Sequence, residues 1–158
     1  MNATEEDERR AATLGGPSPY RLAVRWGECD PFQIVFSPNY FVWFDEATWH
    51  FFASAGLDRD ALRRRHGFAG FPLVKAGIEF HAPCAAGDRL AIHSEIVRWG
   101  ESSFELCHRV LKTDGRLASE GRETRVWTVS ASDGPPISGR IPDEVIARLG
   151  GSRGERKS

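Results

Sequence analysis

The sequence predicts an α+β protein in which an antiparallel sheet wraps around one long buried helix. Apolar side chains recur at helical spacing from Tyr40 to Ala55, and after Leu73 the hydrophobic pattern changes to a period of two. One strand before the helix and several after it form a pattern typical of this class. The chain of 158 residues is long enough for one domain with a core and too short to expect two, so we expect one domain over 19–149 with disordered segments at 1–18 and 150–158.

The long helix has clear start and stop signals. Ser37 places a hydroxyl acceptor at the N-cap, and Pro38 supplies a fixed φ and no N–H at the first helical position. Its apolar residues lie on more than one face, which predicts a helix that is buried rather than lying on the surface. Gly56 offers a left-handed stop.

The other elements follow from shorter patterns. A first strand is expected at Tyr20–Trp26, with Leu22, Val24 and Trp26 on one face. A short basic helix should follow the long one and stop at Gly67. Further strands are expected at 73–81, 87–99, 104–111 and 117–129, with a hairpin turn at 113–115 and a short helix at 141–149.

Charge and cysteine content restrict the partners. A net charge of -1 gives no electrostatic reason to expect nucleic acid or an anionic membrane, so a small soluble ligand is more natural. The three cysteines include no CxxC, which favours the cytosol over a disulfide framework, and Cys29 is better explained as a packing residue than as a nucleophile. We expect no signal peptide, membrane span, metal site or phosphate loop.

Asp30 is the first candidate for chemistry. It precedes Pro31, which indicates a short turn that an aspartate could cap. A carboxylate a few residues before a buried helix would also lie beside N–H groups that can stabilise an oxyanion. Both interpretations are open at the level of local sequence.

The segment G-E-C-D-P-F-Q-I-V-F-S-P-N-Y, Gly27–Tyr40, resembles the 4-hydroxybenzoyl-CoA thioesterase family of hotdog-fold enzymes. The resemblance implies a hotdog fold, Asp30 as the catalytic carboxylate and the backbone N–H near Ser37 as the group that polarises the thioester carbonyl. Phe32 and Gln33 stand where the family commonly has a small residue and glycine.

The same resemblance implies which residues bind substrate. Asp45, in F-V-W-F-D, matches an aspartate that contacts a hydroxyl of the acyl group, although it could instead be a structural carboxylate that needs a partner. Basic residues that hold the nucleotide phosphates in relatives are replaced by Gly100, Glu101 and Ser102. The expected substrate-binding residues are Asp45, Phe36, Tyr40, Phe71 and Arg98.

These observations predict an acyl-CoA thioesterase acting on an aromatic, 4-hydroxybenzoyl-like thioester. Asp30 would be a nucleophile or a general base, and the sequence does not choose between these roles. No cofactor is expected, and family precedent implies a homodimer or homotetramer. The alternative is a hotdog protein that binds acyl thioesters without turning them over.

Overall fold

The computed structural model describes residues 18–154. The expected disordered arm therefore lies outside the described residues apart from Ser18, as does the end of the expected tail, 155–158. The helices and strands, in chain order, are β1 (Tyr20–Ala23), a 3-10 helix (Trp26–Glu28), α2 (Pro38–Ser54), α3 (Arg59–His66), β2 (Phe68–Gly70), β3 (Leu73–Phe80), β4 (Arg89–Trp99), β5 (Ser103–Lys112), β6 (Leu117–Val126), β7 (Thr128–Val129), β8 (Ile137–Ser138) and α4 (Asp143–Arg148).

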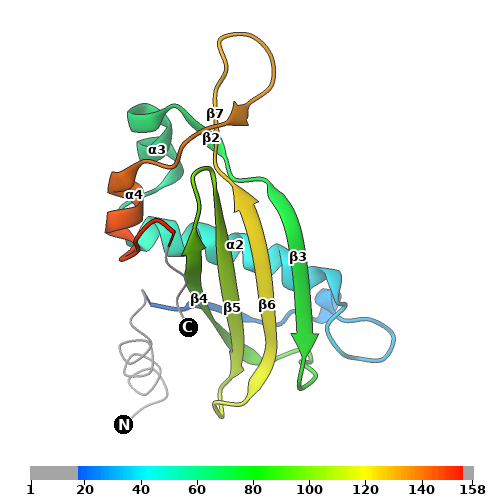
Figure 1. Cartoon of the computed structure of the whole chain (residues 1–158). Coiled ribbons are helices and arrows are strands. Elements are labelled where there is room, and N and C mark those ends of the chain that lie inside the picture. The colour runs from blue at the N-terminus through cyan, green and yellow to red at the C-terminus, as the bar shows by residue number, and fades with distance from the viewer. Residues whose placement is uncertain (1–17, 155–158) are drawn as a thin grey trace. The chain divides into compact units, whose positions relative to one another are not determined.

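The main sheet has five strands in the order β1-β4-β5-β6-β3, which confirms the α+β class (Figure 1). β1 pairs antiparallel with β4, with Tyr20 opposite Ile92. Gly115 has φ 81 in the predicted hairpin between β5 and β6, a left-handed conformation that glycine adopts without steric cost. A smaller sheet of β2, β7 and β8 was not predicted, because strands of two or three residues leave no readable alternation.

The chain divides into two compact units. Of the described residues, the first contains 18–51, 78–94 and 108–121, and the second contains 52–77, 95–107 and 122–154. Each unit has its own buried side chains, and we describe them in turn.

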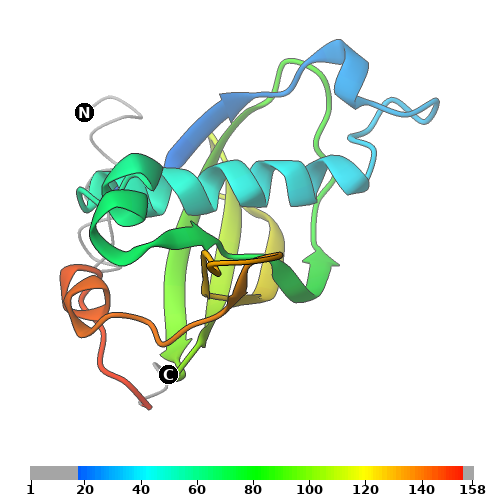
Figure 2. The same cartoon turned by 90° about the horizontal axis from the view of Figure 1, so that it is seen from above.

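In the first unit, α2 packs against the strands beside it (Figure 2). Phe44 is fully buried, and its ring stacks on that of His108 with centroids 4.7 Å apart. A Cβ atom placed on Gly121 would lie 2.2 Å from the Phe44 ring, so the ring rests on the backbone of β6. The apolar cluster is formed by Val24, Val35, Tyr40, Trp43, Phe44, Ala47, Cys84, Leu90, Ile92, Val110 and Ala118.

The start of α2 at Pro38 and the left-handed Gly56 after its end confirm the predicted boundaries. The prediction that the helix avoids the surface is wrong for one of its faces. Val42 is 56% exposed, and Asp45 and Glu46 are exposed beside it. The sequence contains too many apolar residues for this face to be recognised from periodicity.

In the second unit, α3 begins at Asp58, whose carboxylate accepts from the Ala61 N–H, and ends at the left-handed Gly67. A cluster of aromatic rings, Phe52, Phe68, Phe71, Phe104 and Trp127, forms its interior. Residues 150–154 belong to this unit, and Arg153 donates to the Ile141 carbonyl at 2.7 Å. The ordered chain therefore extends past the expected start of the tail.

Two strands differ from expectation in exposure. The expected first strand stops at Ala23, and Trp26 lies in the 3-10 helix with 87% of its surface exposed rather than on a buried strand face. β3 lies at the edge of the sheet, and almost every one of its residues is exposed, including Leu73, Val74 and Phe80. No helix within 18–154 has the length and apolar character needed to cross a membrane.

Candidate active site

Asp30 lies in a tight turn, Asp30–Ile34, that follows the 3-10 helix. Its backbone N–H donates to the Ile34 carbonyl at 2.8 Å, and Cys29 and Val35 form a β-bridge at the base of the turn. One carboxylate oxygen of Asp30 accepts from the Phe32 N–H at 2.8 Å. Within 18–154 the other oxygen has no hydrogen bond, so Asp30 can cap the turn and still present an acceptor.

Gln33, which stands where the family commonly has glycine, has an unusual backbone conformation. It has φ 63, and it is the one residue other than glycine with a positive φ in the described chain. A left-handed conformation costs an L residue with a side chain about 1 kcal/mol more than glycine. Gln33 thus holds a backbone conformation that glycine adopts without steric cost.

Glu28 and Asn39 connect this turn to the helix, and the sequence analysis assigned neither a role. The Glu28 carbonyl accepts from the Phe36 N–H at 2.9 Å and from the Asn39 side-chain amide at 2.8 Å. Its carboxylate accepts from the Trp43 indole at 3.2 Å and from Arg25. Burial raises the pKa of Glu28, but the hydrogen bonds from Arg25 and Trp43 outweigh it, so the pKa lies below its ordinary value.

The backbone N–H groups around the start of α2 are nearly all used. The Val35 N–H donates to the Cys84 carbonyl at 2.8 Å, and the Phe36 N–H donates to the Glu28 carbonyl at 2.9 Å. The Asn39 N–H donates to the Phe36 carbonyl at 2.9 Å, and the Tyr40 N–H donates to the Ser37 carbonyl at 3.2 Å. Pro38 has no N–H. In the part of the chain that the structure describes, the Ser37 N–H has no acceptor, and the Ser37 hydroxyl makes no capping hydrogen bond. The sequence predicted several free backbone N–H groups at the start of α2 and a cap by the Ser37 hydroxyl. Among the described residues at this helix start, the structure has one free N–H group, that of Ser37, and no hydroxyl cap.

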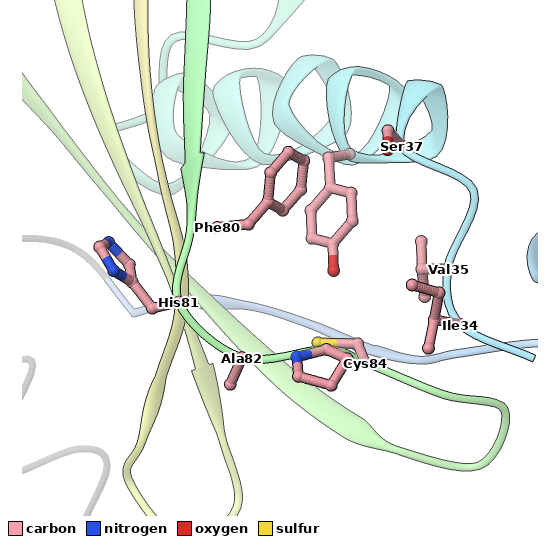
Figure 3. A pocket seen from close by; sticks show the side chains of 9 residues that line it. Ile34, Val35, Ser37, Phe80, His81, Ala82 and Cys84 are labelled. Carbon is pink, nitrogen blue, oxygen red and sulfur yellow. The ribbon is translucent and has the colours of Figure 1, made fainter. Parts of the chain in front are cut away.

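A cavity of about 330 Å³ opens at this position. Figure 3 shows Ser37 at the start of the helix, Ile34 and Val35 along one side, Phe80 opposite them and Cys84 across from Ser37. The lining residues are Ile34, Val35, Ser37, Tyr40, Phe80, His81, Ala82, Pro83 and Cys84. Ile34 and Val35 line the cavity and also pair through their backbones with Asp30 and Cys29, so the Asp30 turn is joined to the cavity wall.

The structure brings together only some of the predicted site residues. Ser37 and Tyr40 line the cavity, and Asp30 is joined to its wall. Phe36 is 54% exposed and Asp45 is exposed, and neither lines the cavity. In the single chain, Asp45 is exposed on α2 and does not line the cavity.

Phe71 and Arg98 belong to the second unit. Phe71 is 4% exposed and packs against Phe52, with the Arg125 guanidinium over its ring. Arg98 is exposed, 3.4 Å from Glu105.

The turn at Gly100–Ser102 is held by C-terminal residues. Arg153 donates to the Gly100 carbonyl at 2.7 Å, and the Glu101 carboxylate pairs with Arg140 at 2.7 Å. Within residues 18–154, no three His, Cys, Asp or Glu side chains are grouped to hold a metal ion.

A turn that carries a carboxylate, a helix-start N–H without an acceptor among the described residues, and an apolar cavity lined in part by the residues that connect them define a site suited to acyl-group chemistry on an α+β fold. The family model of the thioesterase-like superfamily matches residues 24–149, and the chain belongs to this superfamily. It has the hotdog fold and is a thioester hydrolase.

Individual relatives agree with this assignment. The chain is 33% identical over 113 residues to the 4-hydroxybenzoyl-CoA thioesterase of Pseudomonas sp. (strain CBS-3), covering 68% of this chain and 79% of the relative. A crystal structure of an aspartate-to-asparagine mutant of a 4-hydroxybenzoyl CoA thioesterase, complexed with 4-hydroxybenzoyl CoA, matches with TM-score 0.76 and 27% identity, covering 82% of this chain and 96% of that one. A gentisyl-coenzyme A thioesterase matches with TM-score 0.68 and 34% identity, over 83% and 98% of the two chains.

Proposed function

We propose that the protein hydrolyses acyl-CoA thioesters that carry a hydroxylated aromatic acyl group, with Asp30 as the reacting carboxylate. The observation that carries the proposal is the Ser37 N–H, which has no acceptor within 18–154 and belongs to a residue that lines a cavity whose wall is hydrogen-bonded to the Asp30 turn. The relatives support the substrate class, because the acyl groups in their names, 4-hydroxybenzoyl and gentisyl, are hydroxylated aromatics.

The chemistry has two balanced routes. In one, a carboxylate oxygen of Asp30 attacks the thioester carbon, the CoA thiolate leaves, and water then cleaves the resulting anhydride to release the acid and restore Asp30. In the other, Asp30 takes a proton from a water that attacks the same carbon, and that proton passes to the leaving thiolate. In both routes negative charge develops on the carbonyl oxygen, which the Ser37 N–H would stabilise together with the positive end of the α2 dipole.

Assembly into a homodimer or homotetramer is part of the proposal. β3 is an edge strand of eight residues, and its exposed apolar side chains include Leu73, Val74 and Phe80. An edge of this length with unpaired backbone groups favours pairing with another strand. A second copy can supply the same strand under two-fold symmetry.

A panel of CoA esters tests the function directly. Release of free CoA thiol would be measured for 4-hydroxybenzoyl, benzoyl, short-chain and long-chain acyl-CoA. We expect kcat/KM to be highest for the hydroxylated aromatic ester. Preference for an aliphatic ester would contradict the proposed substrate class, and binding of the esters without turnover would contradict the catalytic role of Asp30.

A further inference from the structure

Four consecutive residues after β3 line the cavity at the start of α2. They are His81, Ala82, Pro83 and Cys84, and they belong to the loop 81–88 that joins β3 to β4 (Figure 3). A loop outside the sheet is held in one shape by the hydrogen bonds that its backbone makes to neighbouring elements. The groups that fix this loop therefore also fix one wall of the cavity.

Backbone hydrogen bonds hold the loop at both of its ends. The first end is bound to β6, where the Ala118 carbonyl accepts from two loop N–H groups at 2.8 and 3.1 Å. The second end is bound to Val24, directly after β1, whose N–H donates to the Asp88 carbonyl at 2.9 Å. The cavity-lining residues lie at the first end and in the middle of the loop, so the contacts of the middle decide where the wall stands.

The ammonium group of Lys112, the last residue of β5, binds the middle of the loop. It donates to the Pro83 carbonyl at 2.9 Å and pairs with the Asp88 carboxylate at 2.9 Å. Since proline has no N–H, its carbonyl is the one backbone group through which position 83 can be hydrogen-bonded. Oδ2 of Asp88 also accepts from the Ala85 N–H at 3.0 Å, so one ion pair holds the chain on both sides of Cys84.

This ion pair is partly buried, since the Lys112 and Asp88 side chains are 18% and 30% exposed. Burial raises the pKa of Asp88, but hydrogen bonds from Ala85 and Lys112 outweigh it, so the pKa lies below its ordinary value. Asp88 is therefore charged near neutral pH. A second pair close by, Arg116 with Asp114 at 2.7 Å, has side chains that are 64% and 55% exposed and belongs to the hairpin rather than to the loop.

We infer that Lys112 is a positioning residue for the acyl group, because by binding Pro83 and Asp88 it holds the wall 81–84 in place and limits the cavity to a single aromatic ring. The inference rests on the proposed function and assigns a determinant of substrate size within it. A cavity of about 330 Å³ is at the lower end of the size range of small-molecule sites, so a small displacement of one wall changes which acyl groups fit. Neither Lys112 nor Asp88 lines the cavity, so both act through the loop.

The test compares 4-hydroxybenzoyl-CoA with 1-hydroxy-2-naphthoyl-CoA, which carries a second fused ring. The quantity measured is the ratio of kcat/KM for the smaller ester to that for the larger. Lys112→Met keeps the length of the side chain and removes its charge and its donors, so the wall can move to admit the second ring. We expect the ratio to fall by about tenfold or more, because even one methylene in an apolar pocket changes discrimination by about 10- to 200-fold. A variant that was only less stable would lose activity toward both esters and keep the ratio.

Three further variants separate positioning from a general loss of charge. Lys112→Arg keeps a cation with several donors and should stay within about threefold of the original ratio. Asp88→Asn keeps an acceptor for the Ala85 N–H and removes the charge that pairs with Lys112, so the ratio should fall by about threefold or more. Arg116→Met removes a cation from the neighbouring hairpin and should leave the ratio unchanged.

Hydrogen exchange of the loop gives a readout that does not depend on catalysis. The amides of 81–88 would be followed by mass spectrometry in the unmutated protein, in Lys112→Met and in Arg116→Met. We expect exchange in this segment to be faster by about tenfold in Lys112→Met alone, because amides exchange from locally opened states that the ion pair disfavours.

Several results would overturn the inference. These are an unmutated protein that hydrolyses both esters equally well, a Lys112→Met variant with the original ratio or the original exchange, or an equal fall of the ratio in Arg116→Met. If Lys112→Met does not fold, as judged by circular dichroism, Asp88→Asn decides the question, and its retention of the original ratio overturns the inference. An unmutated protein that hydrolyses no ester of the panel contradicts the proposed function itself, whereas the exchange measurement still tests whether Lys112 holds the loop.

Discussion

The Trp43 indole donates to the Glu28 carboxylate at 3.2 Å, and this contact joins the 3-10 helix to the second turn of α2. Because the Glu28 carbonyl also accepts from Phe36 and Asn39, this residue fixes the chain on both sides of the Asp30 turn. The position of Asp30 relative to the helix start therefore depends on a second carboxylate two residues before it.

Replacing Glu28 by Gln should destabilise the protein by about 1 to 2 kcal/mol near pH 7, since hydrogen bonds to a charged group are lost. The pKa of Glu28 is lowered in the folded chain from its ordinary 4.5. Its contribution is therefore complete above that value and is lost as the pH falls through the folded pKa. Urea unfolding of both proteins at pH 7 and near pH 3 should show that the difference narrows in acid.

A double-mutant cycle with Trp43→Phe identifies the interaction behind this effect. If the Glu28→Gln penalty is the same in both backgrounds and at both pH values, Glu28 acts by packing rather than by its charge.

Asp30→Asn should leave the fold intact and reduce hydrolysis by at least about 100-fold, the lower range for removal of an acid–base group. The amide oxygen of Asn can still accept from the Phe32 N–H, so the turn keeps its cap. Thermal unfolding and CoA release would be measured on the same preparation. Asp30→Ala is the comparison, because it removes the cap as well and should lower both stability and activity. Near-original turnover by the Asn variant would show that Asp30 is only a turn residue.

The thioester carrier should matter less than the acyl group. Glu101 is paired with Arg140, and Arg153 is bound to backbone carbonyls of the Gly100–Ser102 turn, so this turn offers little net positive charge to a nucleotide.

The arginines of α3 are the other basic residues considered for the nucleotide. Arg65 is within 3.3 Å of Glu144, whereas Arg63 and Arg64 are exposed on α3. We expect kcat/KM for a CoA ester and for the matching pantetheine ester to agree within about tenfold, because exposed ion pairs contribute little. A large preference for CoA that survives replacement of Arg63, Arg64 and Arg65 by Ala would contradict this.

Val74→Glu should weaken self-association by about 100-fold or more, because the two-fold axis of a paired β3 edge would bring like charges together in a desolvated interface. Val74→Thr is the control, since it keeps the branched shape of a side chain that is 60% exposed in the single chain. Light scattering across a concentration series gives the mass. A protein that is monomeric at micromolar concentration before mutation and still turns over substrate would refute the proposed assembly.

Local signals were sufficient for the main elements. Ser37–Pro38 located the start of α2, and the change of period after Leu73 located the edge strand β3. The motif around Asp30 predicted its turn and its place before the helix. Each of these features depends on residues that are neighbours in sequence.

The missing parts depend on distant residues. Whether Asp45 is covered is decided by what packs on its face of α2, and the sequence of the helix does not contain that information. The hydrogen bond from the Val35 N–H to the Cys84 carbonyl joins residues that are far apart in the sequence. The role of Glu28 depends on Trp43, which lies one helical turn beyond the motif. The sequence alone does not show which distant residues meet. Such contacts are recognised only when the folded structure brings the residues together.

Phe44 lies so close to Gly121 that a side chain at position 121 would have to displace the ring or the helix that carries it. Ser37 and Tyr40 are carried by the same rigid helix as Phe44, and that ring rests directly on main-chain atoms. The absence of a side chain at position 121 therefore sets how closely α2 can approach β6. A glycine that is not among the lining residues of the cavity thus helps to determine where two of those residues lie.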